Sequence, residues 1–98
     1  MNEYMAIIQF TSSIDEDVIS LIDQQHAYVH DLMEKGALIN YSLSANRKTL
    51  WMNLLAASTE DVEKMLRKMP LSAFMRYEIV ELMFHSSPTS IQIPFSMN

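Results

Sequence analysis

The segment from 74 to 84 constrains the fold more than any other, because it is apolar on both faces of a strand. Side chains alternate across a strand, so each face can be read separately. One face carries Phe74, Val80, Leu82 and Phe84. The other carries Met75, Tyr77, Ile79 and Met83. Helices can cover one of these faces, but a chain of 98 residues has little left to cover the other. We therefore expect a partner subunit, and a pocket with it.

Composition limits the partners that such a chain can have. A chain of this length forms one domain with a modest core. The net charge is −5 and the seven basic residues are scattered, which disfavours nucleic acid and anionic membranes. There is no cysteine, so disulfides and thiolate chemistry are excluded. The first residues lack the pattern of a signal peptide, and no run approaches the ~18 apolar residues of a membrane span. We expect a cytoplasmic protein.

The apolar periodicity predicts six elements in the order strand, helix, strand, strand, helix, strand. The predicted strands cover 3–11, 37–45, 49–57 and 74–84, and the predicted helices cover 13–35 and 58–70. Ser13 and Glu16 form a capping box at the first helix, and Gly36 supplies the left-handed residue that ends it. Asn46 is expected to take the positive φ of the hairpin turn between the middle strands.

This order is typical of the ferredoxin-like βαββαβ fold, an α+β fold with a four-stranded antiparallel sheet and both helices on one face. The uncovered face is still apolar, so we expect two sheets to face each other in a dimeric α/β barrel. The domain is predicted to span 1–86. The segment 87–98 is an irregular tail whose alternating Ile91, Ile93 and Phe95 suit it to clasp a neighbouring subunit.

A set of residues in the second half of the chain resembles a known family. Gly36 ends a helix, a strand-turn-strand unit follows, and Ser58 and Glu60 open the next helix. The set continues with Leu66, Met69-Pro70-Leu71, Phe74-Met75, Glu78, Leu82 and His85. On these residues the chain resembles muconolactone delta-isomerase and its relatives between Gly36 and Pro88. The resemblance implies a dimer or a larger ring, and isomerisation of a small carboxylated lactone by a proton shift without metal or organic cofactor.

The chain departs from the family pattern in two strands. The family's first strand carries an aromatic residue followed by His-Val-Lys, where this chain has Tyr4-Met5-Ala6-Ile7. The family's second strand carries Trp-Arg, where this chain has Ser42 and Leu43. An anionic lactone needs a cation and a proton shift needs a placed base. We therefore expect the family scaffold with a repurposed or lost site.

Two residues are the candidates for catalysis. Gln25 falls in the middle of the apolar stripe of the first helix, where it either orients a ligand in a cavity or bonds a backbone group or Tyr28. His85 ends the last strand, where it acts either as a general acid/base or as a strand-end or interface histidine. His26 and His30 are one helical turn apart, but we interpret them as surface residues and predict no metal site.

Three residues are the candidates for ligand binding. Tyr4 and Trp51 either line an apolar pocket or belong to the core. Arg76 is the first choice of cation for an anionic ligand, although it can instead pair with a neighbouring charge. The leading hypothesis is a muconolactone-isomerase-like protein that binds a small apolar or carboxylated molecule and shifts a proton without a cofactor. The alternative is a non-catalytic ligand-binding or assembly module on the same scaffold.

Overall fold

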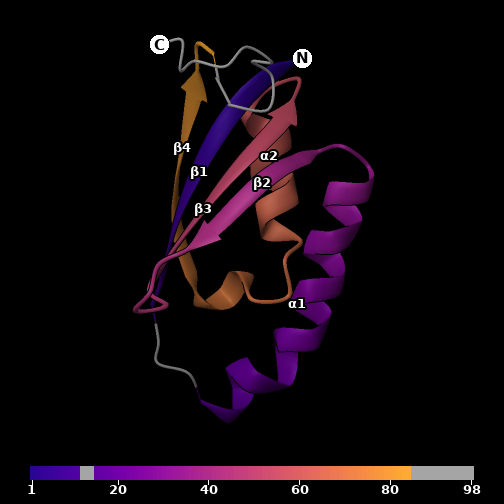
Figure 1. Ribbon diagram of the computed structural model, residues 1–98. Helices are drawn as coiled ribbons and strands as arrows, with labels where there is room; N and C mark the ends of the chain where they lie inside the picture. Colours follow the sequence, from indigo (N-terminus) through magenta and orange to yellow (C-terminus); the bar gives the residue numbers. More distant parts are fainter. Residues whose placement is uncertain (12–14, 85–98) are drawn as a thin grey trace, which may run out of the picture.

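The structure is a computed structural model that describes residues 1–11 and 15–84 (Figure 1). All six predicted elements are present, and a short 3-10 helix, η1, is added before the last strand. The elements are β1 (Asn2–Phe10), α1 (Glu16–Glu34), β2 (Leu38–Leu43), β3 (Thr49–Ala56), α2 (Thr59–Arg67), η1 (Ser72–Phe74) and β4 (Met75–Leu82). The predicted tail, 87–98, lies outside the described residues.

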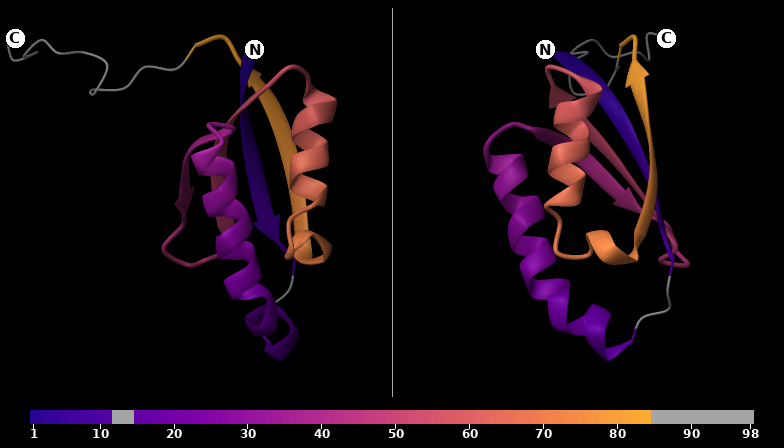
Figure 2. Two further views of the ribbon diagram at one scale, coloured as in Figure 1. Left: turned by 90° about the vertical axis from the view of Figure 1, so that its right-hand side faces the viewer. Right: turned by 180° about the vertical axis from the view of Figure 1, so that it is seen from behind.

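The strands form one antiparallel sheet in the order β2-β3-β1-β4. Both helices lie on the same face of this sheet (Figure 2). In the described ranges, the opposite face is covered by no helix. The predicted ferredoxin-like α+β fold is therefore confirmed. Neither described helix is long and apolar enough to cross a membrane.

The core lies between the sheet and the two helices. Alternate side chains of the central strands point into it, together with one stripe from each helix. Its buried members include Tyr4, Ala6, Ile8, Val29, Leu32, Leu38, Met52, Leu54, Val62 and Leu66. Complete burial of a side chain such as Leu66 contributes about 2 kcal/mol. Met75, Tyr77 and Ile79 of β4 pack half-buried against this cluster, so they form the helix-facing side of the strand.

The helix ends follow local capping, with one correction. The N-cap of α1 is Asp15, whose Oδ1 accepts a hydrogen bond from the Val18 N–H at 3.1 Å. The N-cap is therefore Asp15 and not the predicted Ser13, which lies outside the described residues. Ser58 caps α2 as expected, with its Oγ accepting from the Asp61 N–H at 3.3 Å. Gly36 ends α1 with φ of 78°, as predicted.

The connection from α2 to β4 is longer than predicted. α2 ends at Arg67 rather than at Pro70, because a proline disfavours helical geometry in the residue before it. The chain then turns through η1, in which the N–H of Phe74 donates to the carbonyl of Leu71 at 2.9 Å. Phe74 therefore belongs to η1 and not to the last strand. This turn places Leu71 and Phe74 on the helix side of the sheet.

The hairpin between β2 and β3 also differs from the expectation. Arg47, not Asn46, takes the positive φ, at 64°. The Oδ1 of Asn46 instead accepts from the Ser44 Oγ at 2.7 Å and from the Lys48 N–H at 3.0 Å. These two bonds hold the turn in an Asx-type geometry and force the next residue into the left-handed region. The side chain of Arg47 is thereby set at the sheet end that faces α1.

The face of the sheet away from the helices is apolar in its middle. Its side chains alternate with the core residues of the same strands. The apolar members are Met5, Ile7, Trp51, Leu55, Val80 and Leu82. Trp51 and Val80 remain 38% and 40% exposed. We use the name outer face for this surface below.

Candidate ligand-binding site

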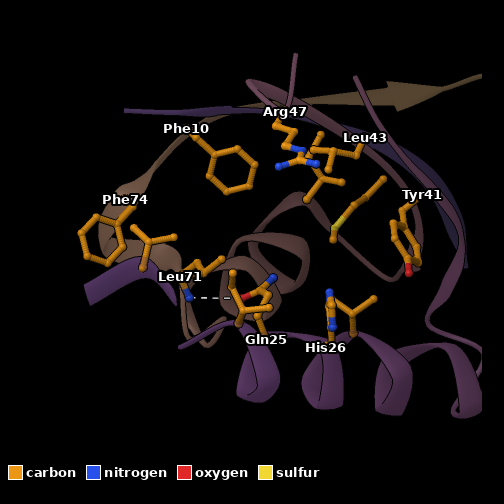
Figure 3. Close-up of a pocket in the computed structure, with 13 residues that line it drawn as sticks. Phe10, Gln25, His26, Tyr41, Leu43, Arg47, Leu71 and Phe74 are labelled. Atoms are coloured by element: carbon orange, nitrogen blue, oxygen red, sulfur yellow. Dashed lines mark hydrogen bonds between the residues drawn. The ribbon is translucent and has the colours of Figure 1, made fainter. Parts of the chain in front are cut away.

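A cavity of about 430 Å³ lies between α1 and the sheet, at the end where β1 stops and the β2–β3 hairpin turns (Figure 3). Thirteen side chains from both sides of the fold line it: Phe10, Val18, Ile22, Gln25, His26, Val29, Tyr41, Leu43, Arg47, Leu50, Met52, Leu71 and Phe74. Most of them are apolar, with a few polar groups among them. That combination and that volume are typical of a small-molecule site.

The α1 wall follows from the spacing of the helix. Val18, Ile22, Gln25 and Val29 recur at three or four residues, so they share the face that points at the sheet. Near its carboxyl end α1 closes onto the sheet, with Leu32 in the core. Around the earlier turns the helix and the sheet are separated by the cavity, so the same apolar stripe serves as core at one end and as pocket wall at the other.

The sheet wall is partly open to solvent. Tyr41 and Leu43 share the helix-facing side of β2, yet they are 46% and 51% exposed. β2 is the edge strand, so these two side chains have a neighbouring strand on one side only, and both line the cavity. A bulge between Leu38 and Asn40 shifts the register of β2, so that Leu38 is buried while Tyr41 faces the cavity. The edge strand therefore forms the mouth of the pocket.

Gln25 is buried and carries two contacts. Its Oε1 accepts a hydrogen bond from the Leu71 N–H at 3.1 Å, and its Nε2 lies 3.4 Å from the Met69 Sδ (Figure 3). The first contact is the backbone bond that the sequence analysis gave as one alternative. The second is weak, because a thioether is a poor acceptor. Gln25 thus fastens the turn after α2 to α1 and lines the cavity at the same time.

Arg47 is the cation of the pocket. Its guanidinium lies across the cavity from α1 (Figure 3). Within the described ranges no carboxylate forms an ion pair with it; the two ion pairs found there are on α1. A non-glycine residue with positive φ costs on the order of 1 kcal/mol, and such strain is concentrated at functional sites. The strained backbone, the pocket position and the unpaired charge all fit binding of an anion.

His26 supplies an imidazole on the opposite wall. It rises from α1 beside Gln25 toward the sheet, on the side of the cavity where Tyr41 lies (Figure 3). It is exposed, so a ligand and solvent can both reach it. Imidazole is the side chain that most readily gains and loses a proton near neutral pH. The pocket therefore combines a guanidinium with an imidazole.

The sequence-predicted site residues are not gathered at this pocket. Gln25 lines it, but Tyr4 is buried in the core at 2% exposure. Trp51 and Arg76 lie on the outer face, where Arg76 borders a shallow hollow with Ile7. His85 lies outside the described residues. The catalytic and ligand-binding roles assigned to these residues stay predictions.

Arg47 and His26 are the pocket residues that the sequence analysis did not propose for the site. The sequence places Arg47 in the hairpin turn of residues 45–48, but the turn pattern does not show where its side chain points. Its position is itself a sequence signal, because the long side chain of an arginine at a hairpin tip can reach the space that the two strands of the hairpin face. His26 was interpreted as a surface histidine, which its exposure confirms, but it directly follows Gln25 and so borders the same helix stripe.

His26 is the one His, Cys, Asp or Glu among the residues that line the pocket. Within residues 1–11 and 15–84 there is no group of three or more His, Cys, Asp or Glu side chains that could hold an ion. His30 lies 3.0 Å from the Glu34 carboxylate, one turn further along the exposed side of α1. The polar chemistry of the cavity therefore comes from Arg47, His26, Tyr41 and Gln25.

Comparisons with known proteins agree with this fold. A family profile described as muconolactone delta-isomerase matches residues 4–88. The crystal structure of muconolactone isomerase at 3.3 Å matches with a TM-score of 0.72 and 17% identity, covering 87% of this chain and 92% of that chain. A comparison with curated proteins gives no match. At this identity the structural likeness shows the fold alone.

The fold and the cavity define a ferredoxin-like α+β protein with a ligand-sized pocket between helix and sheet. Because the family profile spans most of the chain, the protein belongs to the muconolactone delta-isomerase family. Met5 and Ile7, where the family pattern has His and Lys, lie on the outer face. The polar groups of the pocket come instead from α1, β2 and the β2–β3 hairpin.

Proposed function

We propose that this protein binds a small, mostly apolar carboxylate between α1 and the sheet and catalyses a cofactor-free proton shift within it. The observation that carries the proposal is the presence of Arg47 and His26 on facing walls of one apolar cavity. The cavity is open, and it contains Gln25 and a titratable side chain. Met52 is its one methionine among the described residues, so it is not a methionine-filled core.

The chemistry follows from what each group can do. The guanidinium of Arg47 binds the carboxylate through charge-assisted hydrogen bonds. A bound ligand would displace water from the apolar walls, which would strengthen that attraction. The imidazole of His26 removes a proton from a carbon next to a carbonyl group. Because the side chain is exposed, that proton exchanges with solvent before a proton is delivered to another carbon of the conjugated system. One proton is removed and one is added, and no electrons are transferred, so the net reaction is an isomerisation.

Binding tests the anion site. Isothermal titration of the full chain with a butenolide acetate, a single-ring lactone carboxylate, should give a heat of binding that Arg47→Gln weakens about tenfold or more. Lys48→Gln is the matched control: it removes the same charge from the neighbouring residue, which does not line the cavity. Equal loss in both variants would show that only the general charge of the hairpin matters, and would contradict a specific site at Arg47.

Proton exchange tests the reaction. The butenolide acetate is incubated with the protein in D₂O, and both deuterium incorporation and double-bond migration are followed by NMR. His26→Gln should reduce these rates by about 10²-fold or more, as expected for loss of a general acid/base. His30→Gln, one turn away and paired with Glu34, should leave them unchanged. Binding without exchange in the unmodified protein would favour the alternative, a non-catalytic ligand-binding module.

We also propose that the protein is a homodimer built through the outer face. That face carries half-buried and exposed apolar side chains, among them Met5, Trp51 and Val80, which a second sheet would cover. The same face carries Arg76 beside Glu78, so a second copy offers each charge an opposite one. Isolated apolar patches of this extent are uncommon on monomers.

A further inference from the structure

The cavity is larger than a single-ring ligand requires. Its volume is about 430 Å³. A cavity of about 150 Å³ is enough to hold one benzene molecule. A ligand with one small ring would therefore leave more than half of the space to water, much of it against apolar side chains that cannot hydrogen-bond to it. Displacing that water with apolar surface is favourable, so the walls favour a larger ring system.

The polar and apolar groups are separated along the cavity. Phe10, Leu71 and Phe74 gather at one end, Tyr41 and His26 lie toward the other, and Arg47 stands between the two groups (Figure 3). Aromatic side chains pack well against further rings in offset or edge-to-face geometry. A ligand whose anionic group lies at Arg47 would therefore extend its rings toward Phe10 and Phe74.

The charges of the lining limit the ligand to one negative group. Arg47 is the one Lys or Arg among the lining residues, and none of them is an Asp or Glu. A second carboxylate at the end formed by Phe10, Leu71 and Phe74 (Figure 3) would be buried against apolar side chains without a partner, which is costly. A cationic ligand would meet Arg47 with like charge.

We infer, resting on the proposed function, that the ligand is a monocarboxylate with two or three fused or linked rings, held by Arg47 at its carboxylate and by Phe10 and Phe74 at its far ring. This is a larger and more aromatic class than a single-ring lactone. The end formed by Phe10, Leu71 and Phe74 sets specificity, and Arg47, between the two ends, sets orientation (Figure 3).

A size series tests this inference by isothermal titration of the full chain. The probes are benzoate, 2-naphthoate, anthracene-2-carboxylate and the neutral naphthalene-2-carboxamide. We expect 2-naphthoate to bind roughly tenfold or more tightly than benzoate, because the added ring buries further apolar surface. Arg47→Gln should weaken 2-naphthoate and leave the carboxamide within threefold, since only the carboxylate uses the charge.

A variant that fills part of the cavity tests whether the far ring of the ligand binds there. Val18→Phe places an added ring on the α1 wall and should weaken 2-naphthoate about tenfold while leaving benzoate nearly unchanged. Ile19→Phe is the matched control, because Ile19 is the adjacent residue and is 57% exposed outside the cavity. If Val18→Phe fails to fold, the size series on the unmodified chain decides alone.

The outcomes separate this inference from the proposed function. If benzoate or the butenolide acetate binds as tightly as the two-ring and three-ring acids, the inference is overturned while the proposed function stands. If no carboxylate of any size binds, the proposed function fails first. If the carboxamide binds as tightly as the acid and Arg47→Gln changes neither, the assigned orientation is overturned.

Discussion

Gln25 connects three parts of the molecule through one amide group. Its oxygen accepts from the Leu71 N–H, its nitrogen contacts Met69, and its side chain lies on the wall of the cavity. The hydrogen bond fixes the turn that carries Phe74, so the shape of the ring end depends on a residue of α1. Gln25 is therefore a positioning residue in this structure, and the geometry accounts for its burial without any ligand.

Gln25→Leu should lower the free energy of unfolding by about 1–3 kcal/mol, because it leaves the buried Leu71 N–H without an acceptor. Urea denaturation measures the change. Gln24→Leu, an exposed neighbour on the same helix, should change stability by less than about 0.5 kcal/mol. An increase in stability for Gln25→Leu would contradict this structural role, and would indicate that Gln25 is present for ligand binding and not for folding.

The two helices are joined to each other as well as to the sheet. The Tyr28 hydroxyl on α1 donates to the Met65 carbonyl on α2 at 2.8 Å. Together with the Gln25 bond, it fixes α1 against the carboxyl end of α2 and the turn that follows. Partial burial raises the pKa of Tyr28 above its ordinary value of 10.0; the nearby Lys35 opposes the shift and Asp31 adds to it. The phenol therefore stays protonated, and able to donate, across the neutral range.

Tyr28→Phe should lower stability by about 1 kcal/mol at pH 7, since it removes this hydrogen bond. Because the pKa of the folded state is raised, the stabilisation is complete below about pH 10 and is lost as pH rises through the folded-state pKa. The stability difference between the two proteins should therefore shrink above pH 10. Urea titrations from pH 7 to 11 measure it. A constant difference would contradict the role of the protonated phenol.

At the scale of the whole molecule, the two faces of the sheet differ in what covers them. One face packs on α1 and α2 and forms the core. The outer face, with Trp51 and Val80 more than a third exposed, is apolar enough to associate. A small domain gains stability from burying such a surface against a second copy, because its own core is limited.

Val80→Glu should convert the proposed dimer into a monomer at micromolar concentration, because it would place an unpaired charge in the buried interface. Light scattering after size-exclusion chromatography gives the mass. Trp51, the one tryptophan of the chain, should also show a red-shifted emission in the variant. Met33→Glu is the control, with nearly the same exposure (39% against 40%) but on α1. A monomeric mass for the unmodified protein would rule out the dimer.

The sequence by itself determined the order of elements, the capping of α2 at Ser58, the stop at Gly36 and the apolar character of the outer face. These features depend on local spacing and on alternation, which short stretches of sequence contain. It also pointed to the family, which the profile match over residues 4–88 confirms. Local sequence rules allow a cap at Asp15, but which neighbouring polar residue caps α1 depends on competition between them. The helix η1 depends on the turn that follows α2.

Only the tertiary structure decided which residues share a site. Arg47, His26 and Phe74 come from a hairpin, a helix and a 3-10 turn that are far apart in sequence, and they meet because α1 diverges from the sheet at one end. The strand register places Arg76 and Trp51 on the outer face, away from this pocket, and the ligand-binding roles predicted for them stay predictions. A strand pattern gives two faces but not which one meets the helices. Packing of the helices decides which face is covered, and it thereby also decides where the pocket lies.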